Sequence, residues 1–188
     1  EKLLPQEEML EISRASKKMV IGLPLERSFQ ERRIALVPAT VKMLVENGHE
    51  VFIERYAGTA AHFPDADFAE AGAQIVEQPG EVFKSDIILK VAPGSTQEID
   101  FLHEKQSLIS ALHLTGQNKN YFKKLISKKL LAIAFEFIRD KSLASPVLRS
   151  MSEIAGTTSI HIAAEYLSDE KYGNGRLLGG FSGITPSE

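Results

Sequence analysis

Short runs of apolar residues alternate along the chain with segments whose apolar positions recur at helical spacing. Six runs have the length of strands, and they span residues 20–23, 50–54, 74–77, 86–91, 107–114 and 131–138. Strands separated by helices of this length are joined by right-handed crossovers and form a parallel sheet. Because the runs are continuously apolar, both faces of the sheet are expected to be covered. The pattern predicts a doubly wound α/β domain with a flavodoxin-like arrangement, and it leaves the strand order open.

Helices are predicted between the strands from apolar residues three and four positions apart. The clearest helix covers residues 38–47, where Val41, Leu44 and Val45 share one face and Gly48 follows as a stop signal. The other expected helical segments are residues 65–71, 81–84, 96–103 and 117–129.

Two segments lie outside this alternation. Residues 1–18 precede the first strand and are expected to hold a short helix at 6–14. Residues 151–170 indicate a longer helix, capped by Ser152 and followed by a glycine-rich linker at 172–183. The sequence thus predicts an N-terminal extension (1–18), a main domain (19–150) and an inter-domain helix with its linker (151–188).

Composition narrows the possible functions. The 188 residues carry a net charge of −3, which favours neither nucleic acid nor an anionic membrane as a partner. The absence of cysteine excludes disulfides, thiolate catalysis and cysteine-bound metals, and the five histidines show no metal-ligand spacing. No apolar stretch is long enough to span a bilayer, and the first residues do not resemble a signal peptide. We therefore expect a cytoplasmic protein without a metal site.

Three polar side chains are expected at the carboxyl ends of strands, where open parallel sheets bind their ligands. Arg33 follows the first strand, Lys90 lies near the end of the fourth and His113 at the end of the fifth. A guanidinium can grip a carboxylate with two parallel hydrogen bonds, and an imidazole can exchange a proton with a keto or amino group. The alternatives are a surface charge for Arg33 and a structural role for His113. Lys90 needs a partner, an edge or a cleft, since lysine is rarely fully buried alone.

A series of short motifs runs in order through residues 19–188. Its members are Ile21-Gly22-Leu23-Pro24, Glu31-Arg32-Arg33-Ile34-Ala35, Asn47-Gly48-His49, Leu89-Lys90-Val91, Leu112-His113-Leu114, Met151-Ser152-Glu153 and Leu178-Gly179-Gly180. In content and order the series resembles the N-terminal domain of the alanine dehydrogenases. The alpha subunit of NAD(P) transhydrogenase has the same kind of domain.

The resemblance implies a two-domain, NAD-dependent oxidoreductase. Its N-terminal domain would hold an amino acid or 2-keto acid, and a Rossmann domain would hold NAD. Arg33 then matches the arginine that grips the substrate carboxylate, and His113 matches the histidine that assists proton transfer. Met151 and Ser152 match the residues that border the nicotinamide. The family also implies a homo-oligomer.

One position departs from the alanine dehydrogenase pattern. These enzymes have Lys-Val-Lys-Glu-Pro, with a catalytic second lysine, where this chain has Lys90-Val91-Ala92-Pro93. Ala92 is a feature shared with transhydrogenases, whereas His113 is a feature of dehydrogenases. In an extended strand Lys90 and Ala92 point to the same face, so one hypothesis is that Lys90 reaches the vacated place. The alternative is that Lys90 keeps a structural role.

These residues contain no Gly-x-Gly-x-x-Gly turn, so the fragment alone is expected to be inactive. Three interpretations stay open at this point. The first is the substrate domain of an amino-acid dehydrogenase. The second is a transhydrogenase-type domain, which would imply a membrane partner subunit. The third is a degenerate, non-catalytic paralogue.

Overall fold

The computed structural model describes residues 18–173, 175–179 and 182. The predicted helix at 6–14 lies outside the described residues. The chain forms two compact units that divide after Ala134. The predicted boundary at residue 150 falls inside the long helix of the second unit.

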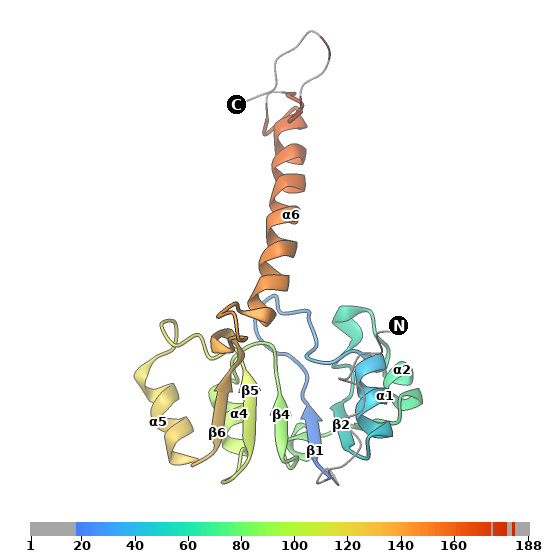
Figure 1. Ribbon diagram of the computed structural model, residues 1–188, viewed down its shortest axis with the longest axis vertical. Helices are drawn as coiled ribbons and strands as arrows, with labels where there is room; N and C mark the ends of the chain where they lie inside the picture. Colours follow the sequence, from blue (N-terminus) through green and yellow to red (C-terminus); the bar gives the residue numbers. More distant parts are fainter. Residues whose placement is uncertain (1–17, 174, 180–181, 183–188) are drawn as a thin grey trace, which may run out of the picture. The chain divides into compact units, whose positions relative to one another are not determined.

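The first unit is built on six parallel strands (Figure 1). They are β1 (Val20–Leu23), β2 (Glu50–Glu54), β3 (Gln74–Val76), β4 (Ile87–Leu89), β5 (Ser107–Ser110) and β6 (Leu131–Ala134), and they lie in the order β3-β2-β1-β4-β5-β6. Without the three-residue edge strand β3, the remaining order is the 2-1-3-4-5 of flavodoxin-like folds. The predicted doubly wound parallel sheet is confirmed, and β3 extends it at the β2 edge.

Helices cover both faces of the sheet because successive strand residues point to opposite sides. They are α1 (Pro38–Glu46), α2 (Asp65–Glu70), α3 (Pro79–Val82), α4 (Thr96–Phe101) and α5 (Lys119–Ser127). One cluster joins β1 and β2 to buried Val41 of α1 and Phe68 of α2. The other cluster joins Ile88 and Leu108 to α4 and α5.

Gly22 of β1 lies against the end of α3 and the segment that follows it. A Cβ atom added at Gly22 would lie 2.6 Å from the carbonyl oxygen of Val82 and 2.9 Å from Ser85 Oγ. Only a residue without a side chain allows β1 and β4 to pair while this segment passes beneath them.

Three strands end two to four residues before their apolar runs do. The runs 86–91, 107–114 and 131–138 yield strands that end at Leu89, Ser110 and Ala134. The sequence stays apolar past these points because the chain remains buried or turns: Val91 and Leu112 are buried, and the 3-10 turn η3 (Phe135–Phe137) follows β6. The apolar run therefore marks burial rather than strand pairing.

The second unit contains η3 and α6 (Pro146–Ser168), a helix of 23 residues. The prediction that Ser152 caps this helix was wrong, because the helix begins at Pro146, after Ser145. Proline is favoured in the first turn, where its missing N–H leaves no helical hydrogen bond unmade. No residue of α6 is buried. Among the described residues, no helix combines the length and apolarity needed to cross a membrane.

Candidate functional site

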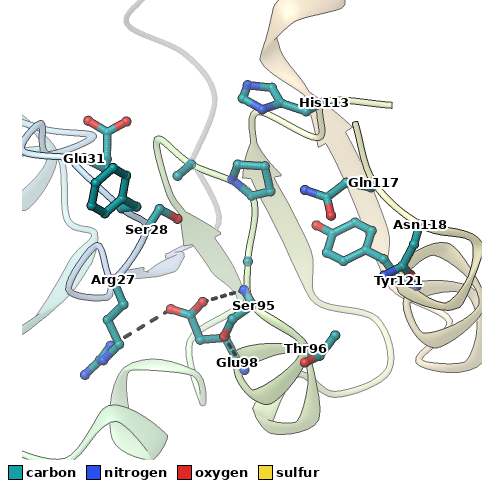
Figure 2. A pocket seen from close by; sticks show the side chains of 14 residues that line it. Arg27, Ser28, Glu31, Ser95, Thr96, Glu98, His113, Gln117, Asn118 and Tyr121 are labelled. Carbon is teal, nitrogen blue, oxygen red and sulfur yellow. Dashed lines mark hydrogen bonds and ion pairs between the residues drawn. The ribbon is translucent and has the colours of Figure 1, made fainter. Parts of the chain in front are cut away.

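The sheet has a topological switch point between β1 and β4, because the chain winds outward in opposite directions from these two neighbours. Crevices beyond the carboxyl ends of strands at such a point are where open α/β sheets bind ligands. A cavity of about 470 Å³ lies there in the first unit. Its walls come from the segments that follow β1, β4 and β5, and Figure 2 shows ten of the lining side chains labelled: Arg27, Ser28, Glu31, Ser95, Thr96, Glu98, His113, Gln117, Asn118 and Tyr121.

Arg33 lies in the segment after β1, as predicted from its position in the sequence, and it grips a neighbouring carboxylate. Its Nε donates to Glu31 Oε1 over 2.8 Å and its Nη2 to Glu31 Oε2 over 2.6 Å. These hydrogen bonds lower the pKa of Glu31 and raise the pKa of Arg33. Glu31 lines the cavity, whereas Arg33 is not among its lining residues. Of the two residues, Glu31 is therefore the one that contributes to the cavity wall.

His113 lines the same cavity from the turn that follows β5. Its backbone is left-handed, with φ 45°, and its carbonyl oxygen accepts hydrogen bonds from Gly116 N at 2.8 Å and Gln117 N at 3.2 Å. A histidine pays a steric cost for this conformation, and such strain is concentrated at functional sites. The turn ends the extended run and leaves the His113 residue exposed at the cavity.

Lys90 and Ala92 have separate environments although they are only two residues apart. Lys90 Nζ lies 3.0 Å from Glu26 Oε2 and 3.1 Å from Glu98 Oε1, and its side chain is 1% exposed. It is not among the residues that line the cavity, whereas Ala92 is. The ammonium is therefore held inside the protein, and a methyl group occupies the cavity wall.

Four charged residues of this region escaped the sequence-based prediction: Glu26, Arg27, Glu54 and Glu98. Arg27 is bound through both terminal nitrogens to the buried carboxylate of Glu54, which raises the pKa of Arg27. Arg27 Nη1 also lies 4.0 Å from Glu98 Oε1 (Figure 2). One signal was available, because Ser95-x-x-Glu98 is a capping-box sequence. Its side chains do form that box at the start of α4.

Met151 and Ser152 belong to the second unit, in the second turn of α6. Ser152 is exposed and Met151 is partly buried. The next residue, Glu153, accepts a hydrogen bond from Nε of Arg149, one turn earlier, at 2.9 Å. No group of three or more acidic or histidine side chains among the described residues is arranged to hold a metal ion.

The chain belongs to the family described as "Alanine dehydrogenase/PNT, N-terminal domain", whose model matches residues 22–155. It is 39% identical to the alanine dehydrogenase of Staphylococcus saprophyticus over 167 residues, which cover 89% of this chain and 45% of that protein. It is also 39% identical to the alanine dehydrogenase of Methanococcus maripaludis, over 90% of this chain and 46% of that protein. The predicted family is confirmed.

Solved structures give the same result. A structure of L-alanine dehydrogenase superposes with a TM-score of 0.85 at 38% identity, covering 90% of this chain and 46% of that chain. A transhydrogenase from Sinorhizobium meliloti superposes with a TM-score of 0.73 at 27% identity, covering 80% and 45%. The chain spans less than half the length of these relatives.

Proposed function

We propose that this chain is the substrate-binding, N-terminal domain of an NAD-dependent, alanine-type dehydrogenase, which interconverts an amino acid with a 2-keto acid and ammonia. The observation that carries the proposal is the cavity at the β1–β4 switch point, with His113 in its wall, in a chain 39% identical to alanine dehydrogenases. The placement of the imidazole at the carboxyl end of β5 supports a role beside a small anionic substrate.

Each polar group has a role that its chemistry supports. Arg33 binds the substrate carboxylate with its planar guanidinium, and Glu31 orients that guanidinium through two hydrogen bonds. His113 exchanges a proton with the oxygen or nitrogen on the reacting carbon. The left-handed turn at His113 ends the extended run at the cavity wall, where the imidazole would lie beside a bound acid.

The nicotinamide cofactor requires residues beyond those of the first unit. After β1 the described chain reads Pro24, Leu25 and Glu26, without the spaced glycines that let a backbone cradle a pyrophosphate. The resemblance to alanine dehydrogenases suggests that Met151 and Ser152 would border the nicotinamide, and that a Rossmann domain would hold the rest of the dinucleotide. When bound, NAD would supply the hydride acceptor for the oxidation of the amino acid. We expect the complete protein to be a homo-oligomer.

A transhydrogenase-type domain is the second candidate. Ala92 favours it, because a methyl group stands in the cavity wall where alanine dehydrogenases carry a catalytic lysine. The likeness to the Sinorhizobium meliloti transhydrogenase agrees with it as well. A non-catalytic paralogue is the third candidate and rests on Ala92 alone.

Assaying the complete protein separates the three candidates. NADH oxidation is followed with ammonia and a panel of 2-keto acids, and hydride transfer from NADH to an NADP⁺ analogue is followed in parallel. Turnover with a 2-keto acid supports the dehydrogenase. Hydride transfer between nucleotides without such turnover supports the transhydrogenase type, and nucleotide binding with neither activity supports the paralogue.

Two substitutions with matched controls connect any activity to the cavity. Arg33→Met and His113→Gln are each expected to lower kcat/KM for the 2-keto acid about a hundredfold or more. Arg32→Met and His103→Gln are the controls, because Arg32 is the exposed neighbour of Arg33 and His103 is an exposed residue ahead of β5. Equal losses in variants and controls would contradict the assigned roles.

A further inference from the structure

Lys90 is a buried cation that the proposed chemistry does not use. Its side chain is 1% exposed, and its ammonium lies 3.0 Å from Glu26 and 3.1 Å from Glu98, whose side chains are also buried. Lysine is rarely buried to this degree unless it is paired. Lys90 does not line the cavity, and its ammonium pairs with the carboxylates of two neighbouring segments.

Glu26 connects the segment after β1 to the end of β4. Its Oε1 accepts a hydrogen bond from Val91 N at 2.6 Å, and its Oε2 accepts one from Lys90 Nζ at 3.0 Å. Both oxygens of one carboxylate are thus satisfied by two consecutive residues beyond β4. The two segments face each other across the switch point, where no backbone ladder joins them.

Glu98 connects the same ammonium to α4. Its Oε1 accepts from Lys90 Nζ at 3.1 Å, and its Oε2 accepts from Ser95 N at 2.7 Å within the capping box. The start of α4 therefore depends on Lys90 as well as on its own cap. One ammonium joins three segments: the one after β1, the end of β4 and the first turn of α4.

The segment after β1 has a second anchor on its other side. Glu54 of β2 accepts hydrogen bonds from Leu25 N at 2.9 Å and from Arg27 Nη1 at 3.1 Å. Residues 25–27 are therefore held from β2 on one side and from β4 on the other. Arg33 and Glu31 lie four to eight residues further along the same segment, so this double attachment determines where they emerge.

We propose that Lys90 is a positioning residue, which fixes the segment that carries Glu31 and Arg33 against the cavity through Glu26 and Glu98. Because its ammonium is held in the interior, Lys90 does not replace the lysine that is missing at Ala92. The contacts and burial of Lys90 carry the structural part. The consequence for substrate binding rests on the proposed function.

The choice of variants follows from the charges. Lys90→Met alone would leave two buried carboxylates without their cation, and such a change can unfold a protein. Glu26→Gln keeps an oxygen that can accept from Val91 N and removes the charge that binds Lys90. The double variant Glu26→Gln/Lys90→Met removes one charge of each sign and leaves Glu98 beside Arg27. Glu77→Gln is the control, because Glu77 is an exposed partner of Arg55 at the β3 edge.

Hydrogen–deuterium exchange of the complete protein tests whether Lys90 and Glu26 hold the segment after β1 in place, and this test needs no activity. In Glu26→Gln and in the double variant, amides of residues 25–37 should exchange about tenfold faster or more, while those of β2 and β5 keep their rates. Glu77→Gln should exchange as the parent does. Unchanged exchange in residues 25–37 of both variants would overturn the proposal, whatever the protein catalyses.

Kinetics of the same variants separate positioning from catalysis. A positioning role predicts that KM for the 2-keto acid rises about tenfold, while kcat changes less than threefold and its pH profile keeps its shape. A loss confined to kcat, with one limb of the pH profile removed, would overturn the proposal in favour of a reacting ammonium. If the parent turns over no 2-keto acid, the proposed function fails. The exchange result still decides whether Lys90 positions the segment after β1.

Discussion

Arg33 and Glu31, two residues apart in the sequence, form a two-point ion pair at the edge of the cavity. The distances are 2.8 Å from Nε to Oε1 and 2.6 Å from Nη2 to Oε2, and the backbone N–H of Arg33 adds a third bond to Oε1 at 3.0 Å. A single carboxylate thereby fixes both the backbone and the side chain of the arginine proposed to hold the substrate. The Glu31 side chain is only 11% exposed, while Arg33 stays half exposed.

The pair predicts an acid-shifted titration of Glu31. Its pKa lies below the ordinary value chiefly because Arg33 donates side-chain hydrogen bonds to the ionised form. A lowered folded-state pKa stabilises the fold above the pKa of an unfolded glutamate, about 4.3. That contribution is lost as the pH falls from there through the lowered value. Carboxyl-carbon NMR of Glu31 across this range is the measurement.

Substitution of Arg33 identifies the source of the shift. Arg33→Met should return the Glu31 pKa toward the ordinary range, and Arg32→Met should leave it lowered, because the side chain of Arg33 donates two hydrogen bonds to the Glu31 carboxylate. A Glu31 titration that is the same in both variants would show that the pair seen here does not persist in solution.

Gly22→Ala should destabilise the first unit. The added methyl group would lie 2.6 Å from a backbone carbonyl oxygen and 2.9 Å from Ser85 Oγ, so β1 or the segment after α3 must move. Overpacking of this kind costs about 1–3 kcal/mol in the free energy of unfolding. Urea unfolding measures the change.

Gly94→Ala is the matched control for Gly22→Ala, because nothing lies within 4 Å of the added Cβ and the glycine is not left-handed. Its effect should stay within about 0.5 kcal/mol. Equal destabilisation by the two substitutions would contradict the assignment of the effect to the close approach at β1.

Ser95→Ala should weaken the start of α4. Ser95 Oγ accepts from Glu98 N at 3.2 Å, and the reciprocal bond from Ser95 N to Glu98 Oε2 measures 2.7 Å. Removal of a cap of this kind costs about 1 kcal/mol. Ser95→Thr retains the hydroxyl and should recover most of the loss in urea unfolding. A Thr variant as unstable as the Ala variant would argue that packing around Ser95, and not the cap, is lost.

The sheet was predictable because apolar runs report burial: five of the six strands begin at the predicted residue, and the sixth, β4, begins one residue later. The ends of β4 and β5 were not predictable, since Val91 and Leu112 stay buried after strand pairing has stopped. The beginning of α6 was misjudged for a related reason. Ser152 looks like a cap, but Pro146 already supplies a helical first turn that no apolar periodicity marks.

The same limit applies to the site. Arg33, Lys90 and His113 were predicted as site residues because each lies at or after the end of a strand, which is a local property. The partners of Lys90 lie 64 and 8 residues away in the sequence, and no local pattern pairs them. The burial of a lysine predicts that a carboxylate lies nearby. Which carboxylates these are, Glu26 and Glu98, becomes clear from the fold.

Ala92→Lys is the substitution that addresses the departure from the alanine dehydrogenase pattern most directly. Ala92 lines the cavity, and the ammonium of Lys90 is committed to Glu26 and Glu98, so a lysine at position 92 would add a cation that the cavity lacks there. In a dehydrogenase this should raise kcat with a 2-keto acid and ammonia by about tenfold or more, since a positioned proton donor contributes rate factors of that size or larger. Ala92→Met adds similar length without charge and should lower activity by filling the cavity. If the Lys and Met substitutions lower the activity equally, the cavity requires a small residue at position 92. That result would favour the transhydrogenase-type interpretation over the dehydrogenase.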